Sequence, residues 1–153
     1  MKVIFLDFDG VLNSNRYFFI AGCEGLAIDP ECMDLLKKLV KDTNVKIVLT
    51  TSWREHWDQD EKNCTVIGKE INTLFSRYQL KVFDKTPKLS TGRESEIEAW
   101  LDENPQVDAF VVLDDCFLDS PRIRGRVCKT DFYRRGLDEK TVAEAKNILE
   151  QTL

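Results

Sequence analysis

The chain has 153 residues, 42% of them hydrophobic and 32% charged, with a formal net charge of −5. This composition predicts one globular domain over residues 1–153, and the negative charge argues against non-specific binding of nucleic acid, although a local basic patch is compatible with it. No apolar run approaches the ~20 residues of a membrane span, and the apolar stretch near the N-terminus is too short for a signal peptide. We therefore expect a cytoplasmic protein without membrane contact. The five cysteines form no C-x-x-C pair, so we expect neither a disulfide scaffold nor a thiolate zinc site.

The predicted elements alternate between strands and helices. A buried strand over 2–8 comes first, and a helix follows that Asp29 caps and Pro30 opens. Residues 45–51 are typical of a second buried strand. A helix over 66–78 comes next in the chain.

The second half of the chain continues this alternation. A short strand over 80–84 precedes a helix, where Thr91 and Glu94 have the spacing of a capping box. Residues 109–115 are a further apolar strand, and 125–130 are a candidate fifth. A last amphipathic helix carries one apolar face, made of Val142, Ala145, Ile148 and Leu149.

Strands that are apolar throughout and alternate with helices are typical of a parallel sheet covered on both faces. The sequence therefore predicts an α/β fold, in which a three-layer, Rossmann-like domain has a mainly parallel central sheet and helices on both faces. Residues 13–29 leave room for a flap but not for a cap domain.

Acidic residues end two of the predicted strands. Asp7 and Asp9 end the first strand, and Asp114 and Asp115 end the strand over 109–115. The carboxyl ends of parallel strands meet at one edge, where ligands bind. Because residues two apart in a strand point the same way, we expect Asp7 and Asp9 to lie close together and repel. A lone aspartate there is usually a turn former, but four favour a hard cation such as Mg²⁺.

Polar and basic residues at the same edge are candidates for binding phosphate. Thr51 and Ser52 end the second strand and offer hydroxyl and N–H groups. Arg93 begins a helix, where free amides favour an anion, and Lys85 and Lys88 compete for the same role. Each of these basic residues is equally compatible with a solvated surface charge.

The stretches FLDFDGVL, VLTTS, a basic residue opening a helix, and VVLDD occur in the order of the four motifs of haloacid dehalogenase-like (HAD) phosphohydrolases. The resemblance spans residues 3–115, and GRESEIEAWL and the later KTD…GL further resemble the small HAD domains associated with RNA repair proteins. It implies that Asp7 attacks phosphorus and becomes an aspartyl phosphate. It also implies that Asp9 protonates the leaving oxygen and then activates water.

The resemblance further implies a set of ligands. Mg²⁺ would be held by the Asp7 carboxylate, the Asp9 carbonyl and one of Asp114 and Asp115, while Thr51 and a basic residue clamp the phosphoryl group. Family members that cleave carbon–halogen bonds lack the second acid, so Asp9 favours phosphoryl chemistry. Many relatives have lysine in the third motif. Here the choice stays open among three residues, of which we favour the first: Arg93, Lys88 and Lys85.

Three features bear on the substrate. Without a cap the site is expected to be open, which suits a bulky substrate, unless an oligomer partner covers it. Trp53 and Arg54 follow the second strand and either stack on a base or, as we favour, pack. Arg134 and Arg135 end an arginine-rich stretch, 122–135, that is either at the site edge or a solvated face.

The sequence thus predicts a Mg²⁺-dependent phosphomonoesterase acting on nucleotides or polynucleotide ends. A phosphatase of small metabolites or phosphoproteins is the alternative enzyme. Two alternatives are of another class. In a phosphoacceptor signalling domain the phosphoacceptor would come from a later strand, and a non-catalytic binding module would not need all four acids. The pattern predicts neither the oligomeric state nor the individual substrate.

Overall fold

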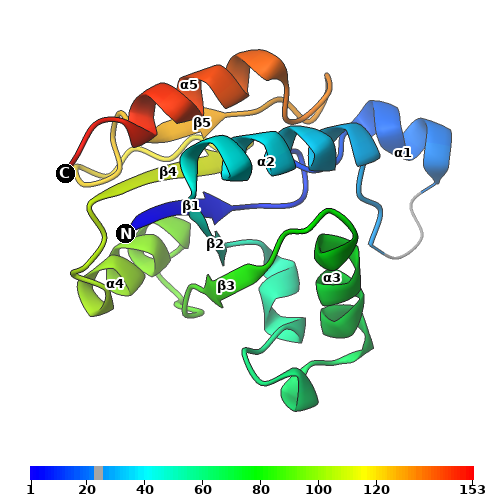
Figure 1. Ribbon diagram of the computed structural model, residues 1–153, viewed down its shortest axis with the longest axis horizontal. Helices are drawn as coiled ribbons and strands as arrows, with labels where there is room; N and C mark the ends of the chain where they lie inside the picture. Colours follow the sequence, from blue (N-terminus) through cyan, green and yellow to red (C-terminus); the bar gives the residue numbers. More distant parts are fainter. Residues whose placement is uncertain (23–25) are drawn as a thin grey trace.

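The computed structural model describes residues 1–22 and 26–153, and within them five strands form one sheet in the order β3-β2-β1-β4-β5 (Figure 1). The strands are β1 (Lys2–Leu6), β2 (Lys46–Leu49), β3 (Val82–Lys85), β4 (Ala109–Asp114) and β5 (Val127–Lys129). The helices are α1 (Asn15–Ala21), α2 (Pro30–Thr43), α3 (Val66–Arg77), α4 (Arg93–Glu103) and α5 (Glu139–Leu149), with the short 3₁₀ helices η1 (Ser52–His56) and η2 (Glu61–Asn63). All four strand pairings are parallel, which confirms the predicted α/β sheet.

Alternating side chains of the strands build two separate hydrophobic cores. On one face, Ile4 and Leu6 of β1 pack with the apolar sides of α2, α3 and α5. On the other face, Val3 and Phe5 pack with α4. Helices therefore cover both faces of the sheet, as Figure 1 shows for α2 and α5 against α4. The three-layer architecture is confirmed, and no cap domain is apparent in the part of the chain that the structure describes.

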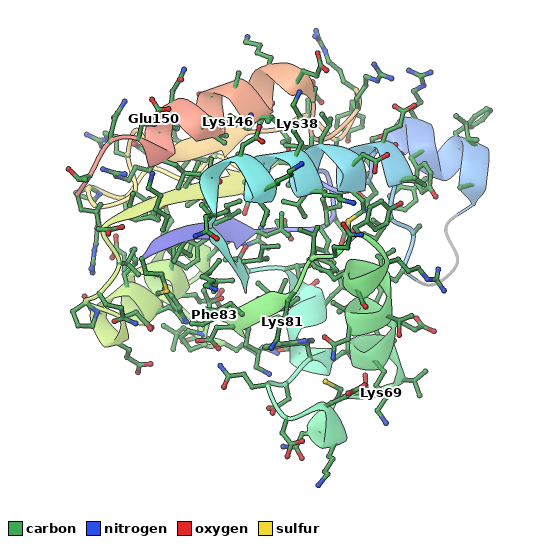
Figure 2. The ribbon with its side chains drawn as sticks, in the orientation of Figure 1. Lys38, Lys69, Lys81, Phe83, Lys146 and Glu150 are labelled. Carbon is green, nitrogen blue, oxygen red and sulfur yellow. The ribbon has the colours of Figure 1, made fainter. Side chains whose placement is uncertain are left out.

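The two helices α2 and α5 lie side by side on their face of the sheet. Lys146 of α5 forms an ion pair with Asp42 of α2, and Figure 2 shows Lys146 and Lys38 projecting from the two neighbouring helices. Within residues 1–22 and 26–153, each helix is too short or too polar to cross a membrane.

The start of α4 differs from the sequence prediction. The residue before the helix is Gly92, with φ at 98°, and it makes no side-chain capping bond. The capping box expected of Thr91 and Glu94 is therefore wrong. Glu94 instead accepts a hydrogen bond from the backbone N–H of Asp119 at 2.6 Å. The helix consequently begins directly at Arg93, which places this side chain at the carboxyl edge of the sheet.

The flap after β1 contains a helix that the sequence did not predict. α1 begins after Ser14, whose hydroxyl accepts from the Tyr17 N–H at 3.2 Å. The Phe18 ring lies 5.9 Å from that of Phe132, and the Asn15 N–H donates to the Phe132 carbonyl at 2.8 Å. The flap is thus attached to the segment that follows β5. Its residues 23–25, which include Cys23, lie outside the described residues.

A glycine fixes the contact between the loop after β1 and the segment after β5. Gly136 has φ at 68°, and a Cβ there would lie 2.6 Å from the Val11 carbonyl oxygen and 2.8 Å from that of Asn13. The adjacent Leu137 N–H donates to the same Val11 oxygen at 2.8 Å. A left-handed conformation and a close backbone approach therefore coincide at this position, and both favour glycine.

We predict that Gly136→Ala lowers the free energy of unfolding more than Gly125→Ala. Both residues have positive φ, so each alanine carries a left-handed cost of about 1–2 kcal/mol. Gly125 has φ at 78° and nothing within 4 Å of its Cβ position, so it reports that cost alone. Urea unfolding of the two variants measures the difference. Equal losses would mean that the backbone at Val11 and Asn13 gives way without cost.

Candidate functional site

The carboxyl edge of the sheet brings together two of the predicted acidic residues and one of the predicted basic residues. Asp7 directly follows β1 and Asp114 ends the neighbouring β4, and the Asp7 N–H donates to the Leu113 carbonyl at 3.0 Å. Arg93 Nη1 donates to Asp7 Oδ2 at 2.6 Å and to Asp114 Oδ2 at 2.5 Å. Both carboxylates are buried, and the guanidinium is partly buried. One arginine nitrogen therefore bridges two acids from adjacent strands.

This bridge leaves an excess of negative charge. Burial raises the pKa of Asp7 to about 6; Arg93 opposes that rise, and the Asp114 carboxylate adds to it. Burial also works against the charge of Arg93, but the two carboxylates outweigh burial and raise the pKa of its guanidinium. Two buried carboxylates face a single guanidinium, so the site favours a further cation.

The donor atoms around this bridge suit a hard cation. Ligand atoms of Asp114, Asp115 and Cys116 lie within 4.8 Å of one another. Burial and the two neighbouring acids raise the pKa of the Cys116 thiol to about 11, so the charged ligands near neutral pH are carboxylates. Gly10, with φ at 81°, allows Asp115 to approach, because a Cβ there would lie 2.5 Å from the Asp115 Cγ. Carboxylate oxygens of this kind fit Mg²⁺ better than a thiophilic metal.

Asp9 lies in a different environment from Asp7. Its side chain is exposed, whereas that of Asp7 is buried. Its Oδ1 accepts from Asn13 Nδ2 at 2.9 Å, and its Oδ2 accepts from Trp53 Nε1 at 3.1 Å. The predicted strand over 2–8 is shorter in the structure: β1 ends at Leu6, so Asp7 and Asp9 both follow the strand and do not lie within it.

Arg54 is buried, which agrees with packing, the alternative that we favoured over contact with the substrate. Its guanidinium forms an ion pair with the buried Glu96 at 2.8 Å. It also donates to the carbonyls of Thr50 at 2.8 Å and Thr51 at 3.0 Å. These contacts join η1 to α4, and they hold the helix that carries Arg93.

The second strand end is arranged around a short 3₁₀ helix. Thr51 is buried, and its hydroxyl accepts from the Trp53 N–H at 3.4 Å. Ser52 is exposed at the first position of η1. Thr50 carries a buried hydroxyl without a hydrogen-bond partner among the described residues. Trp53 packs partly against the core, as we favoured, but its hydrogen bond to Asp9 was not anticipated.

The two lysines that competed with Arg93 are engaged elsewhere. Lys88 is exposed and forms an ion pair with Glu55. Lys85 donates to the backbone carbonyl of Trp57. Of the three basic residues considered from the sequence, Arg93 is the one that bridges the acids.

The arginine-rich stretch is largely paired with acids. Arg134 and Arg135 are exposed, at 3.5 Å from Asp131 and 3.1 Å from Glu31 respectively. Two further pairs have the same character: Arg122 with Asp102 and Arg124 with Asp119. The stretch is therefore not a free positive patch.

Asn13 is a site residue that the sequence did not indicate. Besides contacting Asp9, its Oδ1 accepts from the Gly10 N–H at 2.9 Å, and its Nδ2 also donates to the Ala27 carbonyl at 3.0 Å. Its position three residues after a glycine in a tight turn was the available signal, since asparagine side chains often bond to nearby backbone groups.

The chain matches a known family model over most of its length. The family model described as the HAD domain in Swiss Army Knife RNA repair proteins matches residues 3–142. The match includes Asp7, Asp9, Arg93, Asp114 and Asp115. Searches of curated proteins and of solved structures gave no significant match.

We predict that Asp7→Asn stabilises the metal-free protein increasingly as pH rises from 4 to 7. The Asp7 pKa of about 6 exceeds its ordinary value of 3.8, so the native state retains a proton that the unfolded state has already released in this range. The free energy of unfolding of the wild type therefore falls through this window. Asparagine does not titrate, so the variant becomes more stable than the wild type by up to about 3 kcal/mol as the pH rises.

Unfolding measured in EDTA at several pH values tests this prediction. Asp42→Asn is a matched control with the opposite sign. Asp42 has its pKa lowered, first by the hydrogen bond from Lys146, so this variant should lose stability above its ordinary pKa. A constant difference between Asp7→Asn and wild type from pH 4 to 7 would contradict the assigned environment of Asp7.

Proposed function

The chain belongs to the HAD domains of Swiss Army Knife RNA repair proteins, a family of phosphatase-type hydrolases, and we propose that it is a Mg²⁺-dependent phosphomonoesterase that forms an aspartyl phosphate on Asp7. The observation that carries this proposal is the bridge from Arg93 Nη1 to Asp7 at 2.6 Å and to Asp114 at 2.5 Å. The proposed mechanism needs a nucleophile (Asp7), a phosphate-binding cation (Arg93) and a metal ligand (Asp114) close together at the ends of neighbouring strands, and this bridge supports that arrangement.

In the first step, a carboxylate oxygen of Asp7 attacks phosphorus, and the bond from phosphorus to the leaving oxygen breaks. Asp9 gives its proton to that oxygen, so the alcohol leaves neutral. Asp7 is held for attack, since its Oδ1 accepts from the Phe8 N–H at 2.9 Å and its Oδ2 from Arg93. Arg93 uses Nη1 for the two acids, which leaves its other N–H groups for the phosphoryl oxygens.

In the second step, water attacks phosphorus, Asp9 takes a proton from that water, and the bond from phosphorus to Asp7 breaks. Phosphate leaves, and both aspartates return to their starting states. The Asp7 carboxylate, the Asp9 carbonyl and Asp114 or Asp115 would hold Mg²⁺, which supplies charge neutralisation for the phosphoryl oxygens. Thr51 and Ser52 are proposed to orient those oxygens from the end of β2.

For the substrate we propose nucleotides or polynucleotide ends. The family description names RNA repair proteins, and Asp9 is exposed rather than enclosed. Arg134 and Arg135 would contact backbone phosphates beyond the scissile one. Their ion pairs with Asp131 and Glu31 lie at the surface, where such pairs contribute only about 0–1 kcal/mol, so a phosphate can replace the acid.

We predict that the wild type hydrolyses aryl phosphate with Mg²⁺ and loses this activity in EDTA. Asp7→Asn should abolish turnover, and Asp9→Asn should lower kcat by about 10²–10⁴-fold. Asp108→Asn is the control, because Asp108 pairs with the terminal amine of Met1 at 3.0 Å, at the opposite edge of the sheet. Near-normal turnover by Asp7→Asn, or full activity in EDTA, would refute the mechanism.

We predict that Arg134→Ala/Arg135→Ala weakens the salt dependence of KM for a 3′-phosphorylated oligonucleotide. Each lost phosphate contact on a single strand reduces the log–log slope by about 0.7, so two contacts reduce it by about 1.4. Arg122→Ala/Arg124→Ala removes the same charge from the same stretch and is the matched control. A nucleoside monophosphate or sugar phosphate with the higher kcat/KM at every salt concentration would favour a small-molecule phosphatase instead.

A further inference from the structure

The Asp9 carboxylate accepts a side-chain hydrogen bond on each of its two oxygens, although the residue is exposed. Asn13 donates to Oδ1 at 2.9 Å from the loop after β1, and Trp53 donates to Oδ2 at 3.1 Å from η1 after β2. An exposed aspartate is ordinarily free to rotate and is satisfied by water. Two side-chain donors from different elements restrict this one to a single orientation.

The first donor is itself immobilised. Asn13 is only 2% exposed, its Oδ1 accepts from the Gly10 N–H at 2.9 Å, and its Nδ2 is shared with the Ala27 carbonyl at 3.0 Å. The carbonyl of Asn13 lies under Gly136, where a Cβ would approach to 2.8 Å. The amide therefore presents Asp9 with a fixed N–H group.

The second donor is anchored by packing. The Trp53 ring contacts the hydrophobic core and lies 6.1 Å from the ring of His56. Its backbone N–H is bound by the buried Thr51 hydroxyl at 3.4 Å. Arg54, the next residue, is tied by its ion pair to Glu96. The indole therefore approaches Asp9 from a rigid segment.

Both groups can only support the carboxylate and cannot take part in proton exchange. An indole N–H and an amide N–H donate hydrogen bonds, and neither accepts a proton near neutral pH. A hydrogen bond from them strengthens when Asp9 is ionised, because the acceptor then carries charge. In the proposed mechanism Asp9 becomes ionised when it protonates the leaving oxygen, so these donors favour that step over the uptake of a proton from water.

We propose that Trp53 is a positioning residue, which together with Asn13 orients the Asp9 carboxylate and stabilises it as the leaving oxygen is protonated. This inference rests on the proposed function. It adds a hydrogen-bonding role to the core packing of Trp53, and it does not involve the base stacking considered from the sequence. It requires that the effect of Trp53 pass through Asp9 and depend on how much protonation the leaving group needs.

The test compares Trp53→Phe with Trp57→Phe. Both changes keep an aromatic ring and delete one indole N–H, but Trp57 donates to Asn72 at 2.8 Å and not to Asp9. With Mg²⁺, Trp53→Phe should lower kcat/KM by about 10-fold on alkyl phosphates with poor leaving groups and by much less on p-nitrophenyl phosphate. Trp57→Phe should shift both substrates equally or not at all. Equal losses on both substrates for Trp53→Phe would overturn the inference.

A double-mutant cycle separates positioning from a general structural effect. In an Asp9→Asn background the proton-transfer role is already gone, so adding Trp53→Phe should change kcat/KM little further. Full additivity of the two substitutions would mean that Trp53 acts independently of Asp9, and would overturn the proposal. Melting temperatures of all variants identify any loss that comes from unfolding.

A readout without turnover keeps the two proposals distinguishable. The indole N–H signal missing from the NMR spectrum of Trp53→Phe identifies Trp53. Asp9→Asn should move that signal and leave those of Trp57 and Trp100 in place, since these donate to Asn72 and Asp84. An unmoved Trp53 signal in an active enzyme overturns the inference alone. If the signal moves in Asp9→Asn but the wild-type protein hydrolyses none of the phosphate esters tested, the proposed function is overturned. The positioning role, which depends on that function, is then overturned as well.

Discussion

The burial of two carboxylates beside one guanidinium is the constraint on which the rest of the structure depends. Asp7 directly follows β1 and Asp114 ends the adjacent parallel strand β4, so the sheet itself brings their charges together. Removing a carboxylate from water is costly unless a positive group pairs with it. Arg93 supplies one such charge and makes contact with both acids. The position of α4, which carries this arginine, therefore determines whether the two buried carboxylates are paired.

Several features that look local serve to place α4. The helix begins directly after Gly92, and its first residue, Arg93, contacts both acids. The buried ion pair between Arg54 and Glu96 ties the helix to η1, while Trp100 and Ile97 pack on the opposite face of the sheet from α2. A buried ion pair of this kind is weak support for overall stability, but breaking it would leave an uncompensated charge next to the site. We therefore regard Arg54 as part of the scaffold of the site rather than as a contact for ligands.

The sequence predicted well what depends on periodicity and strand ends. Apolar runs such as 109–115 indicate buried parallel strands, and residues after such strands must gather at one edge, so Asp7, Asp114 and the family could be inferred before any coordinates. Periodicity does not reveal how the backbone turns after a strand. For this reason the separate environments of Asp7 and Asp9 and the missing cap at Thr91 were outside its reach.

Side-chain partners from distant segments were the other limit. A linear pattern does not predict that the indole of Trp53, 44 residues from Asp9 in the sequence, donates to that carboxylate. It also does not predict that Arg54 is buried while its neighbour Trp53 stays partly exposed. The arginines of 122–135 suggested a positive surface partly because two of their acidic partners, Asp102 and Glu31, lie far from this stretch in the sequence. Charge counted along a sequence overstates a patch whenever the fold brings acids to it.

The two aspartates proposed as catalytic differ in the groups that hold them. Asp7 is buried, and its pKa is raised by that burial, so its reactivity depends on cations that restore the ionised form. Asp9 is exposed and is held by neutral donors that restrict its direction. A nucleophile needs charge at a fixed point, whereas an acid–base group must gain and lose a proton without losing its place. The division between a charged, buried environment and a neutral, open one follows from these two requirements, and one strand end with a glycine turn at Gly10 provides both.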